Sequence, residues 1–301
     1  MALMLALVFA VLPAVHAEEG FTIEDVLASP FPTSVTASET GSRVAWVFTL
    51  RGVANVWVAE GPDFEGRQLT AFTADDGRPL EVLGFTPDNE WVFFAKSSRF
   101  NPDQRALGSG PSKLYRVAWA GGDPEELAEA ESAVVSPVEA KLAFVKGERE
   151  LWLVEPGEEP VKIIDARGEL SQPRWSPDGK KLVMATMRGQ YPHRYSFITV
   201  YDIETEEIRY LDASVYLDVR PIWSPDGTQV AFLRRLTGGQ LFGLVAKTVS
   251  NPDPWEVRVA DFATGETVRA WRSPDSDTFY FADLAWFDER RLVFRSERDG
   301  W

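Results

Sequence analysis

The chain has 301 residues, of which 45% are hydrophobic, including 11 Trp and 19 Phe. The aromatic side chains offer enough surface to fill the gaps between the stacked sheets of one folded domain. No linker tract divides the chain. A net charge of −15 argues against nucleic-acid binding, which needs patches of Lys and Arg, and the absence of cysteine excludes disulfides and thiolate sites.

The amino terminus, residues 1–17, is predicted to be a signal peptide. Met1 to Ala14 is almost purely apolar, Pro13 breaks the run, and Val15 and Ala17 suit the −3 and −1 positions of a cleavage site before Glu18. We therefore expect export to the periplasm or the extracellular space, with no membrane span after cleavage. Because no Lys or Arg forms a positive n-region, an upstream start and an uncleaved anchor both stay open, although seventeen residues is marginal for a span.

Two nearly identical pentapeptides, Trp175-Ser176-Pro177-Asp178-Gly179 and Trp223-Ser224-Pro225-Asp226-Gly227, lie 48 residues apart. In each, the ring ends one strand, Pro sets φ at the second turn position, Asp tolerates the bend, and Gly takes the left-handed position that returns the chain as a hairpin. An alternating apolar run follows each copy. The pattern predicts a repeated β-sheet blade, and the motif itself performs no chemistry.

Degenerate copies extend this series in both directions. The six copies start at residues 37, 86, 136, 176, 224 and 287, with spacings of 49, 50, 40, 48 and 63. In the second copy Asn89 replaces Gly, as the next most tolerant left-handed residue. Such spacings suit a four-stranded blade better than any helical repeat.

A second turn recurs within the blades, at Asp202 to Glu207 and at Asp261 to Glu266. Each unit therefore reads strand A, tight turn, strand B, connection, strand C, turn, strand D. One blade cannot bury both of its faces alone, so neighbouring blades must stack. We predict an all-β fold: residues 18–34 lead into a β-propeller over 35–301 with about five complete four-stranded blades, part of a sixth, and an incomplete ring.

Strand direction alternates within a blade, so the A–B and C–D turns share one face and the B–C and D–A connections share the other. The longest insertions, Ser97 to Ser112, Arg188 to Tyr195 and Arg235 to Pro254, are all B–C connections. Because loops placed by a rigid scaffold often carry recognition, we expect this face to contact a further domain or an incoming peptide.

Several segments in this order resemble the amino-terminal β-propeller of exported serine peptidases of the prolyl oligopeptidase family, in the dipeptidyl-peptidase IV and acylaminoacyl-peptidase branch. They are Phe21 to Leu27 with Ser29 to Pro32, Asn55 to Pro62, the Ser-Pro-Asp-Gly blades, Ser196 to Ile198 before Val200 to Asp202, and Asp299 to Trp301. Tol-type periplasmic propellers share the blade motif. The resemblance implies a carboxy-terminal α/β-hydrolase domain as partner, with a Ser, Asp and His triad, and a propeller that admits only short or unfolded peptides.

The sequence departs from that family in having no Gly-x-Ser-x-Gly elbow, and its only histidines are His16 and His193. No catalytic, cofactor-binding or metal-ligating residue is therefore predicted, and no cofactor. The last hairpin stops at Trp301 where a third strand is expected to begin. We therefore expect the chain to be a fragment that lacks the rest of the propeller and the hydrolase domain.

Other suggestive groups have simpler explanations. Glu125-Glu126 and Glu206-Glu207 are similar to paired glutamates that hold a substrate amino terminus, but they lie at or beside hairpin turns. Asp75-Asp76-Gly77 lacks the alternating oxygen ligands of a calcium loop, and Gly108 to Lys113 lacks phosphate-loop spacing and is expected to open a strand. His193 lies in a basic, aromatic loop, and we expect it to be exposed.

Two functions from different classes remain. The first is the substrate-gating propeller of an exported serine exo- or oligopeptidase acting on short peptides, whose missing serine attacks a peptide carbonyl. The second is a stand-alone periplasmic Tol-like propeller that binds proteins or glycans. A Gly-x-Ser-x-Gly elbow, followed by Asp and His in the reading frame after Trp301, distinguishes the first from the second.

Overall fold

The computed structural model describes residues 30–97, 112–130, 132–189, 194–236, 253–276, 279 and 283–296. No helix in these ranges is long and apolar enough to cross a bilayer. The regular elements in these ranges are strands, with the bounds β1 (Phe31–Ala37), β2 (Arg43–Leu50), β3 (Val53–Glu60), β4 (Arg67–Gln68), β5 (Leu80–Phe85), β6 (Trp91–Lys96), β7 (Ser112–Ala118), β8 (Glu125–Ala130), β9 (Ser132–Val135), β10 (Leu142–Lys146), β11 (Glu150–Val154), β12 (Val161–Asp165), β13 (Glu169–Trp175), β14 (Lys181–Arg188), β15 (Tyr195–Asp202), β16 (Ile208–Leu211), β17 (Leu217–Trp223), β18 (Gln229–Arg235), β19 (Trp255–Asp261), β20 (Thr267–Arg272), β21 (Leu284–Trp286) and β22 (Leu292–Phe294).

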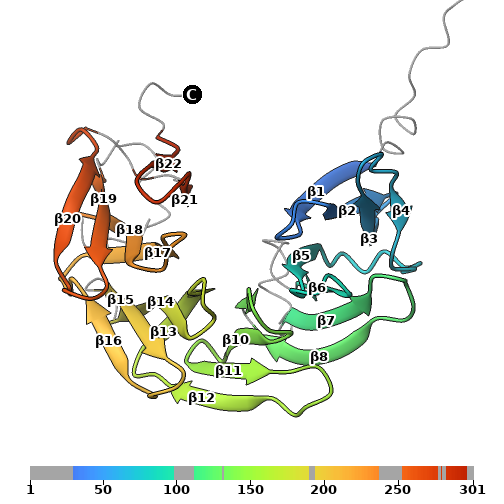
Figure 1. The fold of residues 1–301 in the computed structure, drawn as a ribbon, viewed down its shortest axis with the longest axis horizontal. Helices are drawn as coiled ribbons and strands as arrows, with labels where there is room; N and C mark the ends of the chain where they lie inside the picture. Colours follow the sequence, from blue (N-terminus) through green and yellow to red (C-terminus); the bar gives the residue numbers. More distant parts are fainter. Residues whose placement is uncertain are drawn as a thin grey trace, which may run out of the picture.

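These strands form five four-stranded antiparallel blades and one two-stranded sheet, which confirms the predicted β-propeller. Blades 1 to 3 are β1–β4, β5–β8 and β9–β12. Blades 4 and 5, β13–β16 and β17–β20, are joined by a parallel bridge between Ser196 and Leu217. Figure 1 shows the blades around an open ring, with blade 1 at one end and the β21–β22 sheet at the other. The observed strand order also confirms that the B–C and D–A connections share one face.

The core lies between the blades, because each sheet can bury its faces only against the neighbouring sheets. Each of the five successive pairs of neighbouring sheets encloses its own cluster of buried apolar side chains. Between blades 1 and 2, for example, the cluster includes Val47, Val58 and Phe94, which are at most 1% exposed. Alternate residues of the inner three strands therefore face opposite neighbours, and the propeller is stabilised by radial stacking.

The Ser-Pro-Asp-Gly turns have the predicted left-handed glycines, with φ of 70° at Gly179 and 71° at Gly227. Asn89 occupies the same position in blade 2 with φ of 61°. The Ser176 hydroxyl donates to Asp178 (2.5 Å) and accepts from the Lys181 amide (2.9 Å), which closes the turn. In blade 5 the hydrogen bond from the Ser224 hydroxyl, together with the Thr228 amide, lowers the pKa of Asp226.

Replacement of Gly227 by valine is expected to lower the free energy of unfolding by roughly 1–2 kcal/mol, because a β-branched residue is strained at positive φ. A Cβ at this position meets the Pro177 side chain at 3.5 Å, an ordinary contact, so the cost lies in the backbone. Urea unfolding measures the change. Gly227→Asn is the matched control and should cost much less, since Asn89 already adopts this conformation; equal costs for both variants would contradict the prediction.

Candidate functional site

The first strand of each blade is the innermost one and faces the axis of the ring. Four of these strands contain a β-bulge. The register shifts lie within β1, β5, β13 and β17. Three bulges place a non-glycine residue at positive φ: Ser34 at 53°, Gln172 at 57° and Arg220 at 54°. Because bulges redirect side chains, these positions present polar groups along the axis instead of continuing the sheet's alternation.

The side chains of these three residues reach the first strand of the following blade or the residue just before it. Ser34 Oγ accepts from the Val82 amide (2.8 Å), and Gln172 Oε1 accepts from the Arg220 amide (2.7 Å). The Arg220 guanidinium donates to Asp283 (2.8 Å), directly before β21. The left-handed residues therefore hold neighbouring blades in register at the axis.

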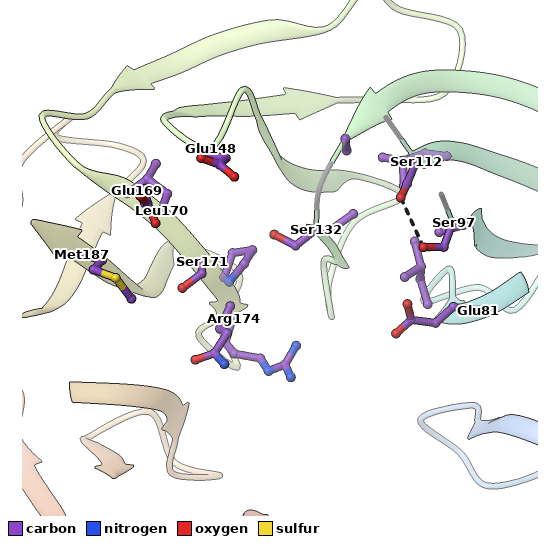
Figure 2. Close-up of a pocket in the computed structure, with 17 residues that line it drawn as sticks. Glu81, Ser97, Ser112, Ser132, Glu148, Glu169, Leu170, Ser171, Arg174 and Met187 are labelled. Carbon is purple, nitrogen blue, oxygen red and sulfur yellow. Dashed lines mark hydrogen bonds between the residues drawn. The ribbon is translucent and has the colours of Figure 1, made fainter. Parts of the chain in front are cut away.

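A cavity of about 610 Å³ lies at the axis, between the first strands of blades 2, 3 and 4 (Figure 2). Its rim includes Ser97, Ser112 and Glu148, which flank B–C connections, so the cavity opens on the face that carries the long insertions. The remaining lining residues are Glu81, Leu83, Ala95, Leu114, Ala130, Ser132, Ala133, Glu169, Leu170, Ser171, Gln172, Pro173, Arg174 and Met187.

Four charged residues line this cavity: Glu81, Glu148, Glu169 and Arg174. Glu169 forms an ion pair with Arg194. Neither Glu81 nor Arg174 has a hydrogen-bond or ion-pair partner within the described residues, and Figure 2 shows both side chains pointing into the cavity from β5 and β13. Partial desolvation by the surrounding protein atoms lowers the pKa of Arg174, although the residue is exposed to solvent; Glu81 opposes this effect, and Arg220 adds to it. The guanidinium still keeps its charge at neutral pH.

The described lining of the cavity offers groups that can bind a ligand. Within the described residues no histidine lies beside its serines; His16 and His193 lie outside those residues. No group of three or more His, Asp or Glu in the described ranges is arranged to hold a metal ion. The arrangement can therefore recognise a ligand through one cation, several carboxylates and the hydroxyls of small side chains.

The glutamate pairs take part in local structure, as their turn positions indicate. Glu125 and Glu126 begin β8 and form ion pairs with Arg116 and Lys113 on the neighbouring strand. Glu206 has a φ of 58°, the turn position that Gly265 occupies in blade 5 with φ of 75°. Neither glutamate pair lines the cavity.

The other suggestive groups also lie apart from the cavity or outside the described residues. Asp75 accepts from the Gly77 amide (3.0 Å), and Asp76 forms an ion pair with Lys96 (2.5 Å), so these carboxylates stabilise a loop. β7 begins at Ser112, which confirms that the segment from Gly108 to Lys113 opens a strand, although residues 108–111 lie outside the described residues. His193 also lies outside them.

Sequence reasoning missed Arg174. The sequence did contain a signal. The residue before the Trp of the turn is the charged Arg174 in blade 4, whereas it is the apolar Ile222 in blade 5. Glu81 carried no comparable signal.

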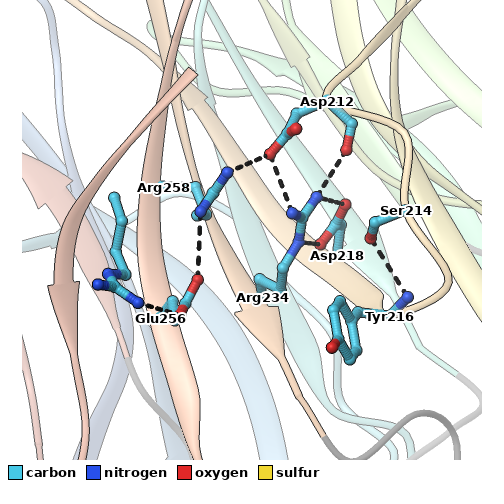
Figure 3. A network of polar contacts seen from close by, with 8 residues as sticks. Asp212, Ser214, Tyr216, Asp218, Arg234, Glu256 and Arg258 are labelled. Carbon is cyan, nitrogen blue, oxygen red and sulfur yellow. Dashed lines mark hydrogen bonds and ion pairs between the residues drawn. The ribbon is translucent and has the colours of Figure 1, made fainter.

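A second polar cluster lies on the same face, between blades 4 and 5 (Figure 3). The buried Arg234 guanidinium donates to both carboxylate oxygens of Asp218 (2.7 and 2.8 Å) and to the Asp212 carbonyl (2.6 Å). Arg258 donates to Asp212 (2.7 Å) and to Glu256 (3.3 Å). Burial opposes the charge of Arg234, but Asp218 and Asp212 outweigh it and raise the pKa of Arg234. Each carboxylate of this cluster pairs with a guanidinium, although the buried Arg258 Nε has no hydrogen-bond partner among the described residues, and we assign the cluster a structural role.

No known protein-family model matches this chain, and no curated protein matches it significantly in sequence. Several solved structures are similar in shape. The putative TolB from Agrobacterium tumefaciens has a TM-score of 0.53 and 16% identity over 81% of both chains. An oligogalacturonate lyase in complex with manganese has a TM-score of 0.56 and 18% identity over 82% of this chain and 68% of its own.

The tricorn protease is also similar, with a TM-score of 0.52 and 14% identity over 78% of this chain and 22% of its own. At these identities the likeness concerns the fold alone. The fold is a β-propeller.

Proposed function

We propose that this chain is the substrate-gating β-propeller of an exported serine peptidase that acts on short peptides. The observation that carries the proposal is the 610 Å³ cavity, which lies on the axis and opens on the face of the three long B–C connections. Pockets of about 300–1,000 Å³ suit small ligands, and short peptides fall in this class. A folded protein cannot enter such a space.

The sequence resemblance supports the same function. The segment from Phe21 to Pro32 leads into the first blade, ending within β1, and the Ser-Pro-Asp-Gly blades follow it in the order found in that peptidase family. The sequence has no Gly-x-Ser-x-Gly elbow, so in this proposal the chain contributes selection and binding, and a partner α/β-hydrolase domain contributes the chemistry. The same resemblance and the apolar segment at residues 1–17 support export.

The alternative is a stand-alone Tol-like propeller that binds proteins or glycans. The likeness to the putative TolB favours it, since that propeller matches over 81% of both chains. The two functions differ in one testable respect. A gating propeller belongs to a polypeptide with a reactive serine, whereas a Tol-like binding propeller needs none.

The test is labelling with a fluorophosphonate probe. We expect the 301-residue chain to remain unlabelled, because no serine in it lies in a nucleophile elbow. The natural polypeptide that carries this sequence, captured with an antibody to the propeller, should be labelled on one serine in a Gly-x-Ser-x-Gly peptide outside residues 1–301. Stoichiometric labelling within residues 1–301, or no labelling of the natural polypeptide, would contradict the proposal.

A further inference from the structure

Arg174 is a charged residue at a position where the other repeats have uncharged residues. Aligned on the turn that follows, the equivalent residues in the other sheets are Thr36, Gly84, Val134, Ile222 and Ala285, none of which is charged. The position lies on the innermost strand, directly before the residue that ends it. A sequence that departs from its own structural repeat at one place, without a local structural gain, indicates selection for function there.

The structure gives Arg174 no structural partner. Its side chain is exposed to solvent and, in the described part of the chain, has neither a hydrogen bond nor an ion pair. Arg174 also lines two further hollows, of about 620 Å³ and 350 Å³, so three spaces meet at this residue. A ligand in any of these three spaces can therefore contact Arg174.

The charges around the cavity restrict the anion that Arg174 accepts. Glu81, Glu148 and Glu169 line the same cavity and repel phosphate or another multiply charged anion. A single carboxylate matches the planar guanidinium with two parallel hydrogen bonds. A ligand that also carries an ammonium group gains from the unpaired Glu81 carboxylate on β5, across the cavity from β13 (Figure 2).

We propose that Arg174 anchors the free α-carboxylate of a short peptide in the axial cavity, with Glu81 receiving the peptide's α-ammonium group. The inference depends on the proposed function for its choice of a peptide as ligand. It adds a selection rule, because a peptide blocked at its carboxyl end loses the Arg174 contact. The propeller then selects peptides by their free ends as well as by their size.

Calorimetric titration of the 301-residue chain tests this site with three probes: tri-alanine, tri-alaninamide and N-acetyl-tri-alanine. We expect tri-alanine to bind at least about tenfold more tightly than tri-alaninamide, which lacks the carboxylate. Arg174→Gln should remove that preference, and Arg174→Lys should retain part of it because Lys is a point charge. Glu81→Gln should remove the preference for tri-alanine over its acetylated form and leave the carboxylate preference intact.

Lys180→Gln is the matched control, since it also removes one positive charge from blade 4, on an exposed turn where Lys180 forms an ion pair with Glu204. Its peptide affinities should equal those of the wild type, and all variants should melt at the wild-type temperature. The proposal is overturned if the amide binds as well as the acid, if Arg174→Gln keeps the preference, or if no peptide binds.

These measurements need no peptidase activity, so the two proposals can fail separately. Arg174-dependent binding without a reactive serine in the natural polypeptide would retain the site and reject the peptidase function. A reactive serine without Arg174-dependent binding would support the peptidase function and reject the Arg174 site.

Discussion

Replacement of Arg234 by alanine is expected to lower the free energy of unfolding by about 3–5 kcal/mol, since it leaves a buried carboxylate without its counter-ion. Asp218 is fully buried, and both of its oxygens accept from Arg234. Arg234 also bonds the Asp212 carbonyl in the connection between blades 4 and 5. The variant therefore disturbs an interface between blades as well as an ion pair.

Urea unfolding followed by tryptophan fluorescence measures this loss. Arg269→Ala is the control, because that side chain is half exposed and makes one ion pair, with Glu256 at 3.2 Å; it should cost less than about 1 kcal/mol. The double variant Arg234→Met with Asp218→Leu should recover much of the stability, since it removes both charges. A loss below 1 kcal/mol for Arg234→Ala would show that water reaches Asp218.

The 301-residue chain, once residues 1–17 are removed, is expected to self-associate despite its net charge of −15. Among the described residues, the open ring leaves two sheet faces without a neighbour. On blade 1, Val35 lies in the bulged part of β1 and is 65% exposed. On the last sheet, Val293 alternates with residues that pack against blade 5 and is 58% exposed.

Charge repulsion is screened over about 8 Å at physiological salt, whereas an exposed strand edge and apolar face act at contact. Light scattering should therefore report oligomers. The paired variant Val35→Lys with Val293→Lys should shift the population toward monomer. Val161→Lys is the matched control, since this valine is 61% exposed on the outermost strand of blade 3 and should leave the association unchanged. A monomeric wild-type chain would contradict the prediction.

The site was much less predictable from the sequence than the fold. The turn chemistry of Trp175 to Gly179 is local, so the repeat could be recognised and its blades counted from residue spacing. The cavity depends instead on which first strands lie next to one another around the axis. Glu81 and Arg174 are 93 positions apart in the chain, and only the ring brings β5 and β13 to the same space.

The sequence by itself determined the blade, its strand order and the left-handed turn positions, because these follow from side-chain alternation and from the few residues that tolerate positive φ. It also determined which face carries the long connections, because strand direction must alternate within a blade. Only the tertiary structure decided that bulges at Ser34, Gln172 and Arg220 tie neighbouring blades at the axis, and that Arg174 has no hydrogen-bond or ion-pair partner among the described residues. Such contacts join residues from different repeats, and their geometry depends on how the blades stack and how far the ring curves.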